Sequence, residues 1–141
     1  MKRRCVWHGL FLFILGLVAG MFVQSMTNPR MGLTTHVGTV LNATFLLAIG
    51  AAWDQVRLEP GAERATFWLI LFGSYGGCAS LLLAAVLGTR NATPIAGAGY
   101  GASAASEALV TASLSVTALA LLVGCVMFLW GLRGSGRGGA P

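Results

Sequence analysis

Apolar residues fill four long stretches of the chain, at about residues 6–26, 33–53, 65–87 and 108–131. A helix needs about 20 mostly apolar residues to cross the hydrocarbon core of a bilayer, and each stretch meets that length. Lipid offers no partners to backbone N–H and C=O groups, so each stretch must satisfy its own as a helix. The pattern predicts an all-α integral membrane protein, a bundle of four transmembrane helices.

The composition agrees with this prediction. Of the 141 residues, 56% are hydrophobic and 9% are charged, too few charges to cover a water-soluble surface. The four spans use most of the chain, so we expect a single transmembrane domain at residues 1–134. The closing residues, 135–141, are rich in glycine with one arginine and predict a disordered basic tail.

The basic start and first apolar run resemble a secretory signal peptide. The run is too long for a signal peptide, and no cysteine follows Leu17-Val18-Ala19-Gly20 as a lipid attachment point. We therefore expect an uncleaved first helix.

The distribution of Lys and Arg predicts the orientation, because positive charge in short loops resists translocation. Seven basic residues fall at the two termini and in the second loop, against two in the first and third loops. The seven are Lys2, Arg3, Arg4, Arg57, Arg64, Arg133 and Arg137, and the two are Arg30 and Arg90. Both termini are expected to be cytoplasmic, in a bacterial inner membrane. The sequence has no run of basic residues interleaved with aromatic residues, the pattern typical of nucleic-acid binding, so we expect no nucleic-acid partner.

Polar side chains interrupt the second span, where an ionisable group is expensive to hold. His36, Thr39 and Asn42 step by three residues and predict one inclined polar stripe on a helix. The stripe has two interpretations. It makes hydrogen bonds between helices, or neutral His36 binds a metal or haem iron while Asn42 contacts a polar group of a substrate.

The second histidine, His8, stands at the cytoplasmic start of the first span, whereas His36 lies near the opposite face. From helix rise and bilayer thickness we expect more than about 20 Å between them. A haem at His36 would then have one protein ligand and an open position. His8, next to Trp7, is interpreted as an interfacial anchor.

The remaining spans carry fewer chemical signals. Tyr75 in the third span either orients a substrate oxygen or nitrogen or is a packed tyrosine. Gly16 and Gly20 form a Gly-x-x-x-Gly pair, interpreted as helix packing. The Gly-rich connection at residues 88–106 is expected to be flexible, with a lid over a site as the alternative. No carboxylate lies at the centre of a span, which argues against a proton-coupled exporter.

Several runs resemble a known family: WHGLFLFILGLVAG, NPRMGLTTHVGTVLNATFLLAIG, TPIAGAG and LWGLRG. They are similar to the hydroxylaminobenzene mutases, over residues 7–134. The His-x-Gly-x-x-x-Asn pattern of His36, Gly38 and Asn42, with the pair His8-Gly9, also resembles the more distant styrene oxide isomerases.

The resemblance implies a membrane isomerase that converts hydroxylaminobenzene into an ortho-aminophenol, by Lewis-acid-assisted migration of the hydroxyl group. By analogy with the styrene oxide isomerases it implies haem b with His36 as iron ligand, Asn42 as the amide that orients substrate, and a homotrimer. Those isomerases carry a tyrosine where this chain has Ser80, so the role of Tyr75 is a separate prediction.

Three alternatives accompany this interpretation. The chain is an aryl epoxide isomerase acting on styrene oxide, a small membrane protein without enzymatic activity, or a haem electron carrier. The first differs in its substrate, the second predicts no pigment and tolerance of His36→Ala, and the third predicts a low-spin iron with two protein ligands.

Overall fold

A computed structural model describes residues 1–133, and these form helices joined by short connections, without a strand. The long helices are α1 (Lys2–Met21), α2 (Pro29–Ala52), α3 (Pro60–Leu87) and α4 (Ala104–Leu132), with 3₁₀ turns η1 (Val23–Ser25) and η2 (Trp53–Gln55). All four long helices are apolar and long enough to cross a membrane. The predicted all-α membrane fold is confirmed. The predicted disordered tail lies outside the described residues.

The helix ends differ from the ends of the apolar stretches because caps, rather than hydropathy, set them. Helix α2 starts at Pro29, after the Asn28 side chain accepts hydrogen bonds from the N–H groups of Arg30 and Met31. Helix α3 ends at Leu87 and is capped by Gly88, whose φ of 68° glycine adopts at little steric cost. Helix α1 stops at Met21, five residues before the predicted end.

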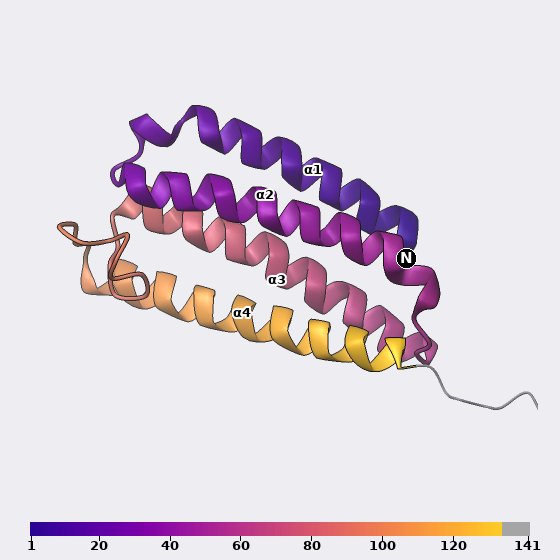
Figure 1. Cartoon of the computed structure of the whole chain (residues 1–141). Helices are drawn as coiled ribbons and strands as arrows, with labels where there is room; N and C mark the ends of the chain where they lie inside the picture. Colours follow the sequence, from indigo (N-terminus) through magenta and orange to yellow (C-terminus); the bar gives the residue numbers. More distant parts are fainter. Residues whose placement is uncertain (134–141) are drawn as a thin grey trace, which may run out of the picture.

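The helices follow one another in space in the order α1, α2, α3, α4, with α2 and α3 in the middle (Figure 1). The main contacts join α1 to α2, α3 to α4, and α2 to α3. Helices α1 and α3 both pack on α2, and a cavity lined by residues of all three helices marks a groove between α1 and α3 over α2.

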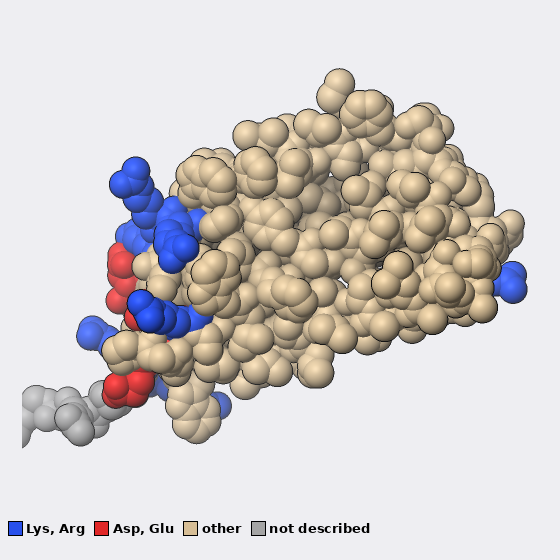
Figure 2. Space-filling model, turned by 180° about the vertical axis from the view of Figure 1, so that it is seen from behind, with Lys and Arg blue, Asp and Glu red and all other residues tan. Residues whose placement is uncertain are grey.

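Charged side chains gather at the end of the molecule that carries the N-terminus (Figure 2). Lys2 and Asp54 form an ion pair of 2.5 Å there, and the indole N–H of Trp53 donates to Glu63 at 2.7 Å. The backbone N–H of Arg57 donates to the carbonyl of Gly131 at 2.9 Å, which joins the second connection to the end of α4. The N-terminus, the second connection and the end of α4 therefore lie at the same end of the bundle (Figure 1).

The connection between α3 and α4, at the opposite end, is fastened rather than free. Asn28 is fully buried and its Nδ2 donates to the carbonyl of Ala96 at 2.9 Å. Glu107 accepts from the backbone N–H groups of Arg90 and Asn91 at 2.9–3.2 Å. The sequence predicted a flexible connection, but in the structure side chains from α4 and from the residue before α2 hold it in place.

Candidate functional site

His36 is half-buried on α2 and faces α1. Its Nδ1 lies 2.8 Å from the carbonyl oxygen of Gly16. A carbonyl oxygen only accepts, so in a neutral ring this contact requires the hydrogen on Nδ1, which leaves a lone pair on Nε2. A histidine that binds a metal ordinarily donates its other ring N–H to a carbonyl or carboxylate in this way.

The donors present are compatible with a haem and not with a multiply ligated metal ion. Among residues 1–133, no three His, Cys, Asp or Glu side chains come together as a metal site. A haem iron needs as few as one protein ligand. His36, whose ring contacts the Gly16 carbonyl through Nδ1, is the residue that could hold a haem through Nε2.

Asn42 faces a different helix from His36. Its Nδ2 donates to Gly38 O at 3.1 Å and contacts Cys78 Sγ on α3 at 3.8 Å. Six residues separate the two side chains, about 9 Å along α2. Thr39 is buried between them and its hydroxyl donates to the Thr35 carbonyl at 2.7 Å. The predicted stripe therefore crosses α2 from the α1 side to the α3 side, and does not bring His36 and Asn42 together.

A cavity of about 470 Å³ occupies the groove between α1 and α3. Thr35 and Thr39 of α2 lie among its lining residues, with Tyr75 and Cys78 of α3. Its other lining side chains are apolar: Leu12, Leu15, Val18, Ala19, Phe22, Met26, Ala79 and Leu82. Neither His36 nor Asn42 lines it, although Asn42 contacts the thiol of Cys78, which does.

Tyr75 is paired with His8, and sequence reasoning missed this pairing. The Tyr75 hydroxyl lies 3.2 Å from His8 Nδ1 and 3.3 Å from the His8 carbonyl oxygen. Tyr75 also lines a second hollow of about 400 Å³ with Trp7, Phe11, Trp68 and Phe72. His8 is half-buried against α3 rather than only an anchor at the membrane surface. Nothing in the local sequence signals a contact between residues 67 positions apart.

The two histidines lie at different depths along α1. His36 contacts Gly16 and Gly20, 8 and 12 residues beyond His8 on α1, or about 12 to 18 Å at the rise of a helix. This is the separation along the helix axis alone, so the expected distance of more than about 20 Å between the two rings stays a prediction. The distance still excludes one iron bound by both rings of one chain.

Ser80, the residue compared above with a tyrosine of the styrene oxide isomerases, is 3% exposed and donates to the Gly76 carbonyl of its own helix at 2.7 Å. Its hydroxyl is thus occupied within α3, and Ser80 does not line the cavity. Ser74, one residue before Tyr75, is buried and its hydroxyl has no hydrogen-bond partner among the described residues. Tyr75 is the hydroxyl of α3 that reaches a cavity.

Comparison with known proteins identifies a family that this chain matches. The profile of a family described as styrene oxide isomerase matches residues 1–133. Hydroxylaminobenzene mutase HabB of Ectopseudomonas oleovorans is 41% identical over 134 residues, 94% of this chain and 82% of that protein. Hydroxylaminobenzene mutase HabA of the same organism is 34% identical over 125 residues, 88% and 93% of the two chains. No solved structure matches.

Proposed function

The chain belongs to the styrene oxide isomerase family and is an isomerase, and we propose that its substrate is an aryl hydroxylamine, which it converts into an ortho-aminophenol. The observation that carries this proposal is the 41% identity, across 94% of the chain, with a protein named hydroxylaminobenzene mutase. The apolar cavity of about 470 Å³ beside Tyr75 has room for a single aromatic ring.

The proposed reaction is an isomerisation, so its atoms balance without a co-reactant. The N–O bond breaks and a C–O bond forms at the ortho carbon. That carbon loses a proton and the nitrogen ends with two hydrogens. Apolar walls exclude bulk water, which favours return of the substrate's own oxygen over capture of a solvent oxygen.

We propose that His36 holds a haem b through Nε2. The hydrogen bond from Nδ1 to Gly16, at 2.8 Å, supports this by fixing the tautomer that leaves Nε2 free. When bound, the haem supplies a Lewis-acidic iron with one open position. Asn42 does not line the cavity but contacts Cys78, which does. We propose that its side-chain oxygen, which takes part in none of its described hydrogen bonds, orients the substrate from there. Tyr75 is proposed to contact the substrate from the cavity wall.

The first experiment combines product analysis with absorption spectroscopy of the detergent-purified protein. We expect ortho-aminophenol from hydroxylaminobenzene, a Soret band, and loss of both in His36→Asn, with activity at least about 100-fold lower. Asn keeps a donor near the position of Nδ1 but has no Nε2. His8→Asn is the matched control, and we expect it to keep the Soret band.

Each other outcome of this experiment has a meaning. A colourless protein that still forms aminophenol would contradict the proposed haem binding but not the proposed isomerase activity. A low-spin spectrum of an iron with two protein ligands, without turnover, favours an electron carrier. A protein with neither pigment nor activity, unchanged in stability by His36→Asn, favours a membrane protein without this chemistry.

Migration of the substrate's own oxygen has a separate test in ¹⁸O-labelled water. We expect the aminophenol to contain no solvent oxygen. Label in the product would mean that water attacks the ring, and would contradict the intramolecular step. The measurement is mass spectrometry of the product after one incubation.

Aryl epoxide isomerisation is the second candidate, because the matching family profile is described as styrene oxide isomerase. The same preparation is given styrene oxide and hydroxylaminobenzene separately. Formation of phenylacetaldehyde, with no aminophenol, would establish this alternative in place of the first.

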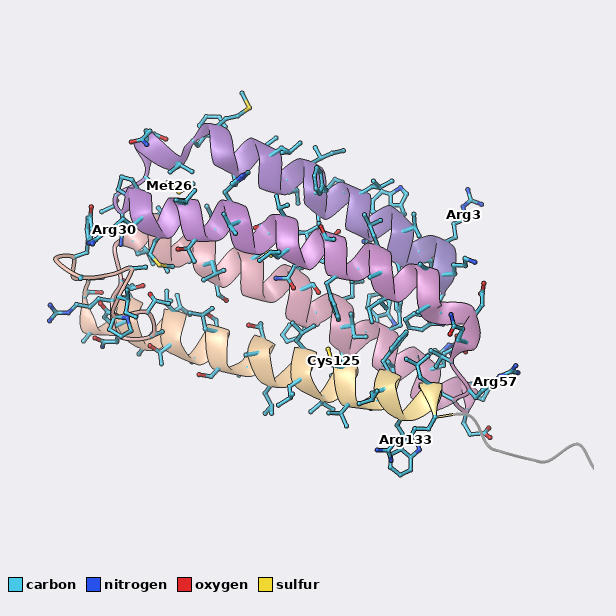
Figure 3. The ribbon with its side chains drawn as sticks, viewed as in Figure 1. Arg3, Met26, Arg30, Arg57, Cys125 and Arg133 are labelled. Carbon is cyan, nitrogen blue, oxygen red and sulfur yellow. The ribbon has the colours of Figure 1, made fainter. Side chains whose placement is uncertain are left out.

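We also propose a homotrimer in the bacterial inner membrane, with both termini in the cytoplasm. The excess of basic residues at the N-terminal end supports the orientation (Figure 3, which labels Arg3, Arg57 and Arg133 at that end and Arg30 at the other). The trimer rests on the family resemblance, and its test is the mass of the purified complex after subtraction of bound detergent.

A further inference from the structure

The Gly-x-x-x-Gly pair of α1 lies where His36 of α2 reaches it. A Cβ atom added to Gly20 would stand 2.6 Å from Nδ1, 2.9 Å from Cε1 and 3.1 Å from Cγ of His36. These three atoms form the edge of the ring that faces α1. Nε2 and Cδ2, on the other edge, point away from α1.

The four-residue spacing explains why both positions matter. In an α-helix the N–H of residue 20 donates to the carbonyl of residue 16, and each Cα–Cβ bond tilts toward the N-terminus. A side chain at residue 20 would therefore stand beside the Gly16 oxygen, in the space that the imidazole occupies. A carbonyl oxygen has two lone pairs, so it accepts from His36 as well as from its own helix.

Gly16 contributes by allowing close approach of the helices. A Cβ there would meet Val40 Cγ2 at 3.0 Å and Thr39 Cγ2 at 3.2 Å, both on α2. Without that approach the Gly16 carbonyl would lie farther from α2 than the 2.8 Å hydrogen bond allows.

We propose that Gly16 and Gly20 form a seat for the His36 ring, and that Gly20 is a positioning residue of the site. The seat selects the tautomer with hydrogen on Nδ1 and turns Nε2 outward as the free ligand atom. The tautomer claim concerns the cofactor-free chain. Only its consequence for haem affinity rests on the proposed function.

The wild-type chain tests the tautomer directly. It contains only two histidines, so ring-¹⁵N-histidine labelling gives few NMR signals, and His8→Asn assigns those of His36. In cofactor-free protein in detergent we expect a protonated Nδ1 and a bare Nε2 for His36. A His36 that carries its hydrogen mainly on Nε2 overturns the proposal without any variant.

Gly20→Ala tests the seat, with Gly9→Ala as the matched control. Both glycines lie on α1 against α2, and a Cβ at Gly9 would also stand too close to a neighbour, 2.9 Å from the tip of Leu47. We expect Gly20→Ala to shift or mix the His36 ring signals and to weaken haem binding about 10- to 100-fold. Gly9→Ala is expected to leave the ring signals unchanged and haem affinity within about twofold.

The outcomes separate positioning from packing and from the function. Equal effects of the two variants on the ring signals, or no effect of Gly20→Ala on them, overturns the seat. If the protein binds no haem but the tautomer and the Gly20 effect are found, the seat stands and the haem proposal fails. Helical circular dichroism and elution volume of each variant identify loss of the fold, in which case the wild-type spectrum decides.

Discussion

Asn28 holds two parts of the chain together at the weakly charged end. Its Oδ1 accepts from the N–H groups of Arg30 and Met31 at 3.1 and 3.2 Å, and its Nδ2 donates to Ala96 O at 2.9 Å. The residue is 0% exposed, so these groups have no water to replace a lost partner. One buried amide thus caps α2 and anchors the connection between α3 and α4.

We expect Asn28→Ala to lower the free energy of unfolding by about 1 to 3 kcal/mol, since it leaves buried groups without partners. Asn28→Ser keeps an acceptor for the cap but not the reach to Ala96, so its loss is expected to be smaller. The measurement is denaturant unfolding in detergent.

Asn91→Ala is the control for that measurement, because Asn91 is an exposed residue of the same connection. We expect a change within about 0.5 kcal/mol. A loss in the control equal to that of Asn28→Ala would contradict the role given to buried Asn28.

The sequence alone identified the candidate polar residues, but not the residues that they contact. His36 and Asn42 are conspicuous as polar groups in an apolar span, and the structure gives both of them specific partners. The partners themselves, Gly16 for His36 and His8 for Tyr75, lie on other helices. Their pairing depends on the rotation of each helix, which a single sequence does not reveal.

At the scale of elements, α3 and α4 approach through glycine. A Cβ at Gly73 would lie 2.6 Å from Cβ and 2.8 Å from Cα of Leu121. Because one of these atoms is backbone, no side-chain rotation relieves the contact. In lipid, such close backbone approach is a main source of helix association.

Gly73→Ala is therefore expected to destabilise the chain by about 1 to 3 kcal/mol through overpacking. Gly61→Ala is the control on the same helix, since a Cβ there meets nothing within 4 Å, and we expect a change within about 0.5 kcal/mol. Both are measured by unfolding in detergent. Equal stability of the two variants would mean that α3 and α4 do not meet at Gly73.

Hydropathy was sufficient to find the four helices and insufficient to find their ends. Helix α3 includes the charged first turn with Glu63, and α4 begins after the Ser103 cap, before its apolar stretch. These turns are polar because they lie at the ends of the spans. Their helical state depends on caps and prolines rather than on apolar periodicity.

At the scale of the whole molecule, charge is distributed unevenly between the two ends. Among the described residues, the charged groups away from the N-terminal end are Arg30, Arg90 and Glu107. The carboxylate of Glu107 accepts hydrogen bonds from backbone N–H groups. This asymmetry was predicted from the positions of Lys and Arg. The order of packing of the helices was not, because it depends on which small residues face each other.

The orientation is tested with single cysteines in a chain whose Cys5, Cys78 and Cys125 are replaced by alanine. We expect Asn91→Cys to react with a membrane-impermeant maleimide in intact spheroplasts, and Arg57→Cys to react only after permeabilisation, because basic loops stay in the cytoplasm. Both sites are exposed. The reverse result would invert the topology, and labelling of both without permeabilisation would contradict opposite locations for the two loops.

The groove between α1 and α3 has a kinetic consequence. Four side chains of its cavity, Leu15, Val18, Phe22 and Leu82, are 39 to 57% exposed on the surface that faces lipid. For the proposed aryl hydroxylamine, which is lipophilic, we expect entry to Tyr75 from the hydrocarbon rather than from water. The turnover rate should then depend on the concentration of substrate within the lipid. Adding empty lipid or detergent at constant total substrate lowers that concentration, and we expect it to lower the rate.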